Sequence, residues 1–487
     1  IMLRIPEEQI IKRLRTENPW WEAPHEVPGP FRDWRPRPYL ELFFPLVDAG
    51  QIQRAVVLMG PRRVGKTVLV HHAIMRLLEQ GIKPRRLCYL SVDHPLYTGL
   101  SLEELLEYYQ TSTGVNIEQE PCFVFFDEIQ YLPGWENHLK ALVDRHWPTR
   151  FIVSGSAAAA LRLKSYESGA GRFTDFILPP LTFHEFLCLR RMEDLVEVHP
   201  PEARSAIPVR SSDIETVNKH FLDYLNFGGY PEAVLSEEIQ SDPGRFIKSD
   251  IIDKVLLRDL PSLYGIQDIQ ELNRLFTTLA FNTAGEVSLE ELSKKSGVAK
   301  STLNKYIEYL QAAFLLRVVH RIDRNARRFK RATSFKTYLT NPSIRSALFS
   351  TVKSDDPFTG HLVETALFAQ YFHYPNFPLY YARWHKKEME VDLVCLKEKG
   401  NVNPVNWATE VKWSDKPYNE PERLKSLLKF CHAQNLQQAW VTSRTASGSH
   451  TIQSVTINFL PASLFCYVVG YRMLQRKTFS LDIFQQD

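Results

Sequence analysis

Eight consecutive residues, Gly60-Pro61-Arg62-Arg63-Val64-Gly65-Lys66-Thr67, constrain the fold of this chain more than any other stretch. An apolar run from residue 55 to 59 leads into them, and residues 67 to 78 follow with apolar positions at helical spacing. A glycine-rich loop between a strand and a helix presents backbone N–H groups to a phosphate, and the helix N-terminus adds favourable partial charge. The segment therefore predicts a P-loop within a parallel α/β sheet.

The positions of this loop have expected roles. Gly60 and Gly65 shape the backbone, Lys66 neutralises the β and γ phosphates of ATP, and Thr67 places its hydroxyl on Mg²⁺. A chance glycine loop is the competing interpretation, and the complete pattern in its strand–helix context counts against it. The residues expected to bind the nucleotide are Gly60, Pro61, Arg62, Arg63, Val64, Gly65, Lys66, Thr67, Val68 and Ser154.

A second apolar run, residues 122 to 126, ends in two acids, Asp127 and Glu128. Asp127 is expected to hold Mg²⁺ through water, and Glu128 to polarise the water that attacks the γ-phosphate. Two acids after a buried strand are also a plain strand exit. The P-loop earlier in the chain favours the catalytic interpretation.

Two further segments are candidate parts of the ATP site. Residues 151 to 156 place Ser154 and Ser156 at the end of another strand, the edge where α/β proteins bind ligands. Either serine could sense the γ-phosphate, and a tight turn is an equally good interpretation. Arg172 is a candidate arginine finger for the ATP of a neighbouring subunit, although a lone arginine is more often a surface residue.

With these motifs the chain resembles the AAA+ ATPases, in particular a prokaryotic branch whose P-loop reads Gly-Pro-Arg-Arg-x-Gly-Lys-Thr. The resemblance covers roughly the whole chain and rests also on residues 127–130, 154–156, 171–172, 181–186 and 226–232. It implies an ATPase domain joined to a winged-helix segment and a restriction-nuclease-like C-terminal domain. It constrains the chemistry better than the cellular role.

Residues 289 to 307 have the length and the glycine turn of a helix-turn-helix, whose second helix commonly enters the DNA major groove. Lys300, Asn304 and Lys305 form the polar face of that helix. A basic cluster suited to phosphate contacts follows, namely Arg317, His320, Arg321, Arg324, Arg327, Arg328, Lys330 and Arg331. The alternative is that the segment packs domains together and the charges are a solvated face.

Near the C-terminus, Glu364 lies on an expected helix, Asp392 in an alternating strand, and Glu410 and Lys412 in the next strand. Residues i and i+2 of a strand face the same side, so Glu410 and Lys412 should project together. Two carboxylates with a lysine can bind Mg²⁺ and activate water for phosphodiester cleavage, with Asp392 and Glu410 as metal ligands.

This arrangement is similar to the PD-(D/E)XK nuclease superfamily, and most of all to its Holliday-junction-resolvase branch. All four positions of that pattern are filled, by Glu364, Asp392, Glu410 and Lys412, which are therefore the catalytic candidates. The departure from the pattern is Val391, which stands where a proline often precedes the aspartate. A retained fold that only grips DNA is the alternative to an active nuclease.

Length and composition predict several ordered domains in a cytoplasmic protein. The chain has 487 residues, too many for one core, and its 44% hydrophobic and 24% charged residues are typical of globular proteins. Six scattered cysteines without a CxxC pair suggest a reducing compartment, and no apolar run is long enough to span a membrane. The expected parts are an N-terminal arm (1–50, extended over 19–38), an AAA+ core (51–180), a helical lid or linker (181–260), a winged-helix segment (261–345) and a nuclease-like α/β domain (346–487).

Together these patterns predict a homo-oligomer, such as a hexamer, that couples ATP hydrolysis to the binding and remodelling of duplex or branched DNA. The net charge of +3 is too small to identify a polyanion partner by itself. Two alternatives stay open. One is an ATP-controlled switch whose C-terminal parts bind a protein, and the other is a defence nuclease licensed by ATP.

Overall fold

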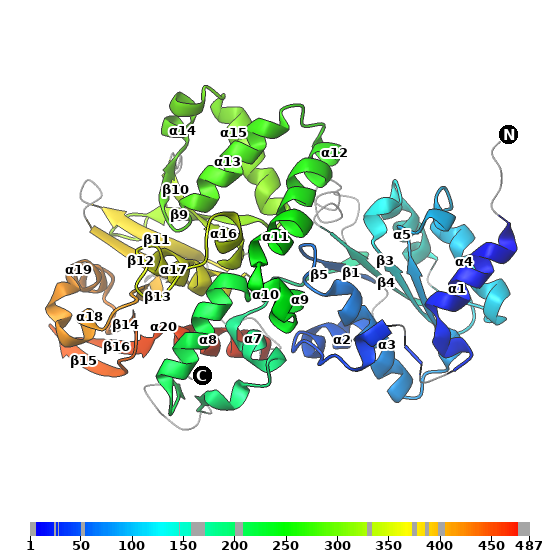
Figure 1. The fold of residues 1–487 in the computed structure, drawn as a ribbon, viewed down its shortest axis with the longest axis horizontal. Coiled ribbons are helices and arrows are strands. Elements are labelled where there is room, and N and C mark those ends of the chain that lie inside the picture. The colour runs from blue at the N-terminus through cyan, green and yellow to red at the C-terminus, as the bar shows by residue number, and fades with distance from the viewer. Residues whose placement is uncertain are drawn as a thin grey trace. The chain divides into compact units, whose positions relative to one another are not determined.

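A computed structural model describes residues 6–23, 26–27, 29–49, 54–145, 147–156, 171–199, 208–328, 334–372, 377–384, 389–397 and 405–475. The chain divides into two compact units, Ile1–Leu178 and Pro179–Asp487 (Figure 1). The finer division into five parts stays a prediction. In the described residues, no helix combines the length and the hydrophobicity that crossing a bilayer requires.

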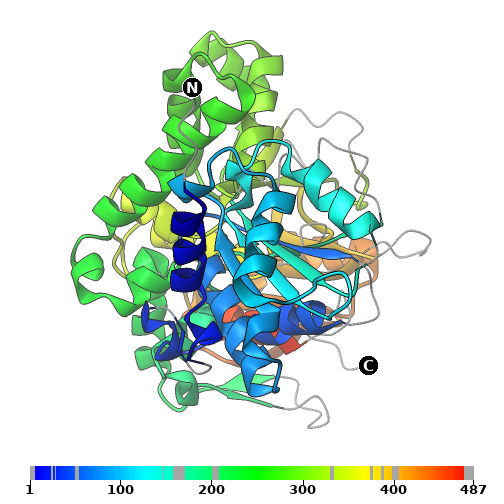
Figure 2. The same ribbon diagram turned by 90° about the vertical axis from the view of Figure 1, so that its right-hand side faces the viewer.

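The first unit is built on a parallel sheet with the strand order β2-β3-β4-β1-β5 (Figure 2). Its strands are β1 (Ala55–Met59), β2 (Leu87–Ser91), β3 (Phe123–Asp127), β4 (Arg150–Gly155) and β5 (Phe173–Ile177). Its α-helices are α1 (Glu7–Glu17), α2 (Leu40–Asp48), α3 (Lys66–Glu79), α4 (Leu102–Thr113) and α5 (Trp135–Asp144). Every residue of β1 and β3 is buried, as expected for parallel strands that helices cover on both faces. The predicted parallel α/β sheet is confirmed, with β5 as a strand that was not predicted.

The expectation of an extended arm over residues 19 to 38 is wrong. Pro19–Trp21 and Gly29–Arg32 are short 3-10 helices. Trp20 is fully buried, and the indole N–H groups of Trp20 and Trp21 both donate to the carbonyl oxygen of Leu87, over 3.1 and 2.7 Å. The segment therefore packs against β2 and does not extend away from the domain. Burial of the large apolar tryptophan rings is favourable in free energy and stabilises this packing.

The second unit contains a mixed sheet with the strand order β15-β16-β14-β13-β12-β11-β9-β10-β8 (Figure 1). Its strands are β8 (Glu286–Ser288), β9 (Leu316–Ile322), β10 (Ser334–Leu339), β11 (Leu379–Trp384), β12 (Met389–Leu396), β13 (Val405–Glu410), β14 (Gln438–Ser443), β15 (Gly448–Ile452) and β16 (Val455–Pro461). β6 (Glu197–Val198) and β7 (Val209–Arg210) form a separate pair. Strands on both sides of residue 345 therefore share one sheet, because β9 pairs in parallel with β11.

The helices of this unit are α7 (Phe183–Leu189), α8 (Ile214–Phe227), α9 (Pro231–Leu235), α10 (Glu237–Ser241), α11 (Pro243–Ile247), α12 (Leu260–Tyr264), α13 (Ile269–Phe281), α14 (Leu289–Ser296), α15 (Lys300–Ala312), α16 (Ser343–Leu348), α17 (Thr359–Ala369), α18 (Lys416–Asn419), α19 (Lys425–Gln434) and α20 (Ala462–Gln475). The two helices predicted on either side of Gly297 are α14 and α15, and Gly297 ends α14 in the left-handed conformation with φ 74°. All six cysteines of the chain are buried free thiols.

Candidate functional site

The P-loop connects β1 to α3, and two glycines allow its course. Gly65 has φ 92°, a left-handed conformation that favours glycine. A Cβ atom at Gly60 would collide with the carbonyl oxygen of Leu178. Lys66 is buried, and its Nζ donates to the carbonyl oxygens of Gly60 and Pro61 over 3.1 and 2.8 Å. The ammonium group therefore lies against the loop that would wrap the phosphates.

The other predicted nucleotide-binding residues follow the same loop and the first turn of α3. Val64 is fully buried, Arg62 and Val68 are half-buried, and Arg63 is exposed in the left-handed conformation with φ 63°. Thr67 is the second residue of α3, and its hydroxyl donates to Asp127, the last residue of β3. The loop thus lies at the carboxyl end of β1, the edge where parallel sheets bind ligands.

Asp127 collects hydroxyl groups from three elements. Its Oδ2 accepts hydrogen bonds from Thr67 Oγ1 at 2.6 Å and from Tyr89 O–H at 2.8 Å, and its Oδ1 accepts one from Ser154. The carboxylate is 2% exposed. The structure therefore brings together three predicted residues, Thr67, Asp127 and Ser154, at the carboxyl ends of β3 and β4. Tyr89, in the middle of β2, was not predicted.

Glu128 lies beside this group in the left-handed conformation with φ 55°. The side-chain amide of Gln130 donates to Glu128 Oε2, and its oxygen accepts from the backbone N–H of Ser156 over 3.1 Å. Burial raises the pKa of Glu128, which the Lys66 ammonium opposes. Gln130 thereby ties the candidate base to the turn after β4, a role that the sequence motif did not suggest.

Arg172 lies at the other end of the sheet from the P-loop. It precedes β5, whose first residue pairs with Ala55, whereas the P-loop follows Met59 at the far end of β1. Its Nε donates to Asp144 Oδ1 over 2.5 Å, and its side chain is 35% exposed. Arg172 therefore does not reach the ATP site of its own chain.

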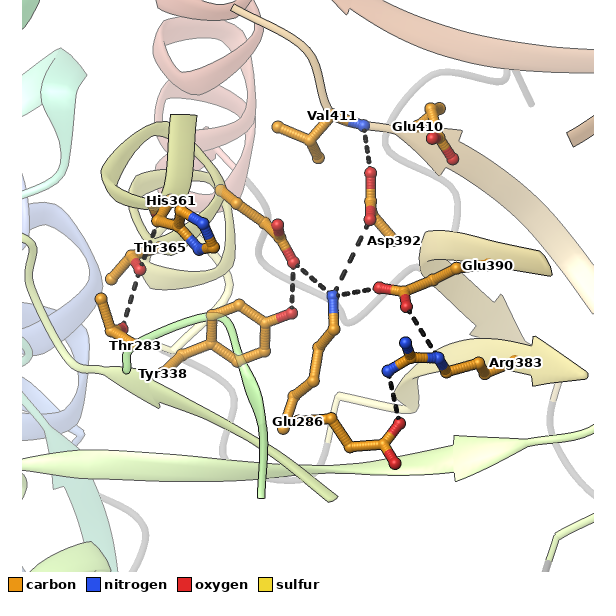
Figure 3. Close-up of polar contacts among 12 residues, drawn as sticks. Thr283, Glu286, Tyr338, His361, Thr365, Arg383, Glu390, Asp392, Glu410 and Val411 are labelled. Atoms are coloured by element: carbon orange, nitrogen blue, oxygen red, sulfur yellow. Dashed lines mark hydrogen bonds and ion pairs between the residues drawn. The ribbon is translucent and has the colours of Figure 1, made fainter. Parts of the chain in front are cut away.

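A second cluster of charged residues lies in the second unit, around β10, β12 and α17 (Figure 3). Lys412 Nζ is 2.7 Å from Glu410 Oε1 and 3.5 Å from Asp392 Oδ2. The backbone N–H of Val411 donates to Asp392 Oδ2 over 2.8 Å. Asp392, Glu410 and Lys412 are thus together as predicted. The predicted reason for the proximity of Glu410 and Lys412, a shared strand face, is wrong, because β13 ends at Glu410 and Lys412 lies beyond the strand.

The predicted Glu364 joins the cluster through a residue that the sequence analysis missed. Lys336 Nζ lies 2.9 Å from Glu364 Oε1, 2.6 Å from Glu390 Oε1 and 3.8 Å from Asp392 Oδ1. Tyr338 O–H also donates to Glu364 Oε1, over 2.7 Å. Lys336 and Tyr338 stand at i and i+2 of β10, and this alternation was the signal that could have identified them.

The pKa values of Glu364, Glu410 and Asp392 are shifted in different directions from their ordinary values. Burial raises the pKa of Glu364 to about 7, and burial together with the nearby Asp392 raises that of Glu410 to about 8. Burial also opposes ionisation of Asp392, but the ammonium groups of Lys412 and Lys336 keep its pKa below the ordinary value. Asp392 is therefore the carboxylate that is ionised throughout the neutral range.

These pKa values predict how stability depends on pH when divalent ions are chelated. The folded pKa values of Glu364 and Glu410 lie above the ordinary 4.5, so their contribution to stability is complete at lower pH and is lost as pH rises through about 7 to 8. Urea unfolding in EDTA should therefore show the second unit losing stability between about pH 5 and pH 8.5. In Glu410→Gln this loss should be smaller. An equal or larger loss in that variant would contradict the assignment.

The residues predicted to form a DNA-binding helix-turn-helix differ in their exposure. Lys300, Asn304 and Lys305 are exposed on α15. Arg324, Arg327 and Arg328 are exposed in the segment after β9. His320 is exposed as well, but Arg317 and Arg321 are half-buried, and the Arg317 guanidinium lies 5.4 Å from the centre of the Phe372 ring. Arg317 therefore does not belong to an exposed phosphate-binding face, as was expected. Lys330 and Arg331 lie outside the described residues.

Comparisons with known proteins agree with the first of these two sites. Residues 52–187 match the model of a family described as an AAA domain, and residues 218–355 match one described as a domain of unknown function. An uncharacterized protein of Haemophilus influenzae is 25% identical over 316 residues, which cover 63% of this chain and 71% of that protein. One from Methanocaldococcus jannaschii is 26% identical over 324 residues, which cover 63% of this chain and 66% of that protein.

Among solved structures, the chain is similar to the Aeropyrum pernix ORC1 protein in complex with DNA. The TM-score is 0.31 at 14% identity, over 70% of this chain and 97% of that one. The assignment of the first unit rests instead on the family match together with the strand, loop and carboxylate geometry. Residues 52–187, with their P-loop between β1 and α3, are an AAA domain of the P-loop ATPase class.

Proposed function

We propose that the first unit hydrolyses ATP and that hydrolysis drives an action on DNA bound by the second unit. The observation that supports hydrolysis is the group of Thr67, Asp127 and Ser154 beside Lys66, with Glu128 adjoining it. Lys66 would balance the charge of the β and γ phosphates, and Glu128 would orient and deprotonate the attacking water. Ser156, whose hydroxyl is buried and hydrogen-bonds to none of the described residues, adds a candidate contact for the γ-phosphate.

The residues present fit the Mg²⁺ that such a reaction uses. Thr67 Oγ1 and Asp127 Oδ2 are oxygen donors only 2.6 Å apart, and oxygen ligands are what Mg²⁺ prefers. Thr67 would hold the ion directly and Asp127 through water. When bound, Mg²⁺ supplies charge neutralisation at the β and γ phosphates.

The sharpest test of the combined function is an ATPase assay with a panel of single-stranded, duplex, forked and four-way DNA. The proposal expects hydrolysis to accelerate with DNA, and most of all with the preferred structure. If ATP binds but DNA changes neither the rate nor the affinity, the ATP-controlled switch with a protein partner becomes the better explanation.

The assignment of Arg172 as a finger that acts across subunits leads to a distinct prediction. Because Arg172 lies far from its own P-loop, Arg172→Ala should lower hydrolysis in the assembled oligomer while leaving ATP affinity unchanged. Mixing it with Lys66→Ala protein should restore part of the activity, since some interfaces then combine an intact P-loop with an intact finger. Arg76→Ala, which removes a half-buried arginine paired with Glu41, is the matched control.

DNA binding by the second unit is supported by the order of its elements around α15. α13, β8, α14, α15, β9 and β10 follow one another, with β10 antiparallel to both β8 and β9. This is the order of a winged helix, in which α15 would enter the major groove and residues 323–328, directly after β9, would belong to the wing. Lys300, Asn304 and Lys305 are exposed where such a helix would read DNA.

Phosphate contacts by the arginines after β9 predict a change in salt dependence. Replacing Arg324, Arg327 and Arg328 with alanine should reduce the slope of log affinity against log salt by about one for each arginine that contacts phosphate. Fluorescence anisotropy with duplex DNA from about 50 to 200 mM salt measures this slope. Lys83→Ala with Arg85→Ala, two exposed residues of the first unit, is the control. An unchanged slope would favour a role in domain packing.

We further propose that the cluster of Asp392, Glu410 and Lys412 is a phosphodiester-cleaving site of the PD-(D/E)XK kind, with branched DNA as the preferred substrate. Asp392 and Glu410 offer oxygen donors to a divalent ion, and Glu410 Oε2 is buried without a hydrogen bond from any described residue. Lys412 would steady the negative charge that develops on the phosphate. A bound Mg²⁺ would supply Lewis-acid activation of water.

A further inference from the structure

The carboxylate cluster of the second unit has a cation of its own on one side. Lys336 is 3% exposed, and its ammonium nitrogen lies among Glu364, Glu390 and Asp392 at 2.9, 2.6 and 3.8 Å. These three acids come from α17 and β12, whereas Lys336 comes from β10. A buried ammonium surrounded by oxygens from separate elements is in the environment that a metal ion would otherwise have.

The lysine is fixed in that place by its neighbours. Its Nζ is 5.4 Å from the centre of the Tyr381 ring, and Tyr338 holds the same oxygen of Glu364 that Lys336 contacts. Glu390 in turn forms an ion pair with Arg383, at 3.2 Å, and Arg383 pairs with Glu286 at 2.8 Å. Figure 3 shows this chain of ion pairs running from Glu286 through Arg383 to Glu390.

A divalent ion and the Lys336 ammonium cannot share this side of the cluster, because the Lys336 side chain is only 4% exposed and is enclosed by the acids that it contacts. Lys412 also contacts Asp392 and Glu410, but its side chain is 39% exposed and can move aside for an ion there. Metal–oxygen distances are about 2.0 to 2.6 Å, so an ion bridging Glu364 and Asp392 would have to enter the space between oxygens that Nζ already contacts. Two positive charges at such a separation in a buried site would repel each other strongly.

We propose that Lys336 is a built-in replacement for a divalent ion on the Glu364 side, so that this cluster accepts at most one divalent ion, on the side of Asp392 and Glu410. This inference rests on the proposed nuclease-like site. Lys336 would then set the number of metal ions that the site binds. Its ion pairs would also hold α17, β10 and β12 together without a metal ion. Replacing the lysine by a neutral residue of similar length should open a new site for a divalent ion.

Ion counting on the full-length, nucleotide-free protein tests this, with Mn²⁺ alone as the probe. Lys336→Met should bind about one more Mn²⁺ per chain than the wild type, because the buried ammonium that lies among three carboxylates is removed. Its thermal unfolding temperature should fall in EDTA and recover when Mn²⁺ is added. Lys353→Met removes an exposed lysine of the same unit and should change neither measurement.

A second variant makes the result specific to the carboxylates. Adding Glu364→Gln to Lys336→Met should abolish the extra Mn²⁺ and restore the unfolding temperature in EDTA, since one negative charge is removed. If Lys336→Met binds no extra Mn²⁺, or stays unfolded at saturating Mn²⁺, the inference is overturned. The proposed nuclease-like site fails separately, if Asp392→Asn binds as much Mn²⁺ as the wild type.

Discussion

Replacing Glu128 with glutamine should leave ATP binding intact and reduce hydrolysis by about 100-fold or more, because the variant keeps the size of the side chain and loses the base. Lys66→Ala should instead weaken ATP binding itself by about 100-fold, since it removes a charged donor to the β and γ phosphates. Nucleotide affinity by titration calorimetry and phosphate release under single-turnover conditions separate the two effects.

The control for both variants is Lys83→Ala, an exposed lysine of the same unit that is expected to change neither quantity. Hydrolysis at the wild-type rate in Glu128→Gln would remove Glu128 from the catalytic role. Gln130 would then have to be regarded as holding a structural carboxylate, because its amide contacts Glu128 directly.

Nicking of a four-way DNA junction by the wild type, with Mg²⁺ or Mn²⁺, should disappear in Asp392→Asn and in Lys412→Met. Asp392 is the carboxylate that its neighbours keep ionised, and Lys412 is the cation nearest to both Asp392 and Glu410. Glu422→Gln, which alters an exposed acid of the same unit, should still nick. Circular dichroism and thermal unfolding show whether each variant is folded.

Binding and cleavage are separable in this experiment. If the wild type cuts no branched, duplex or single-stranded substrate, yet binds four-way DNA and hydrolyses ATP faster in its presence, then the cleavage proposal is wrong. The cluster would be a DNA-gripping remnant, and branch migration would become the better proposal for what ATP hydrolysis drives.

The P-loop conformation and its contact with Asp127 could be predicted because the sequence pattern of the loop is local. The glycines, Lys66 and Thr67 are contiguous, and the conformation at Gly65 follows from the loop sequence itself. Gln130 and Tyr89 were not predicted as site residues. Tyr89 reaches Asp127 only because β2 and β3 are neighbours, and a pairing between strands cannot be read from one local pattern.

The second cluster shows the same limit more clearly. Glu364, Asp392, Glu410 and Lys412 were chosen by their spacing, whereas Lys336 lies outside that spacing and reaches the cluster because β9 pairs with β10 and β11. The burial of Trp20 and Trp21 was not predicted for a related reason. A proline-rich sequence does not indicate that β2 provides a surface against which these rings pack.

The continuous sheet of the second unit has a consequence for how this protein could have been assembled from parts. A cut of the chain at residue 345 would separate β8, β9 and β10 from β11, leaving two unpaired strand edges and removing Lys336 from Glu364. Exposed edges invite aggregation, and a buried carboxylate without its cation is costly. The segment from α13 to β10 and the carboxylate cluster are therefore expected to unfold together, and to be inherited or transplanted only as a single unit.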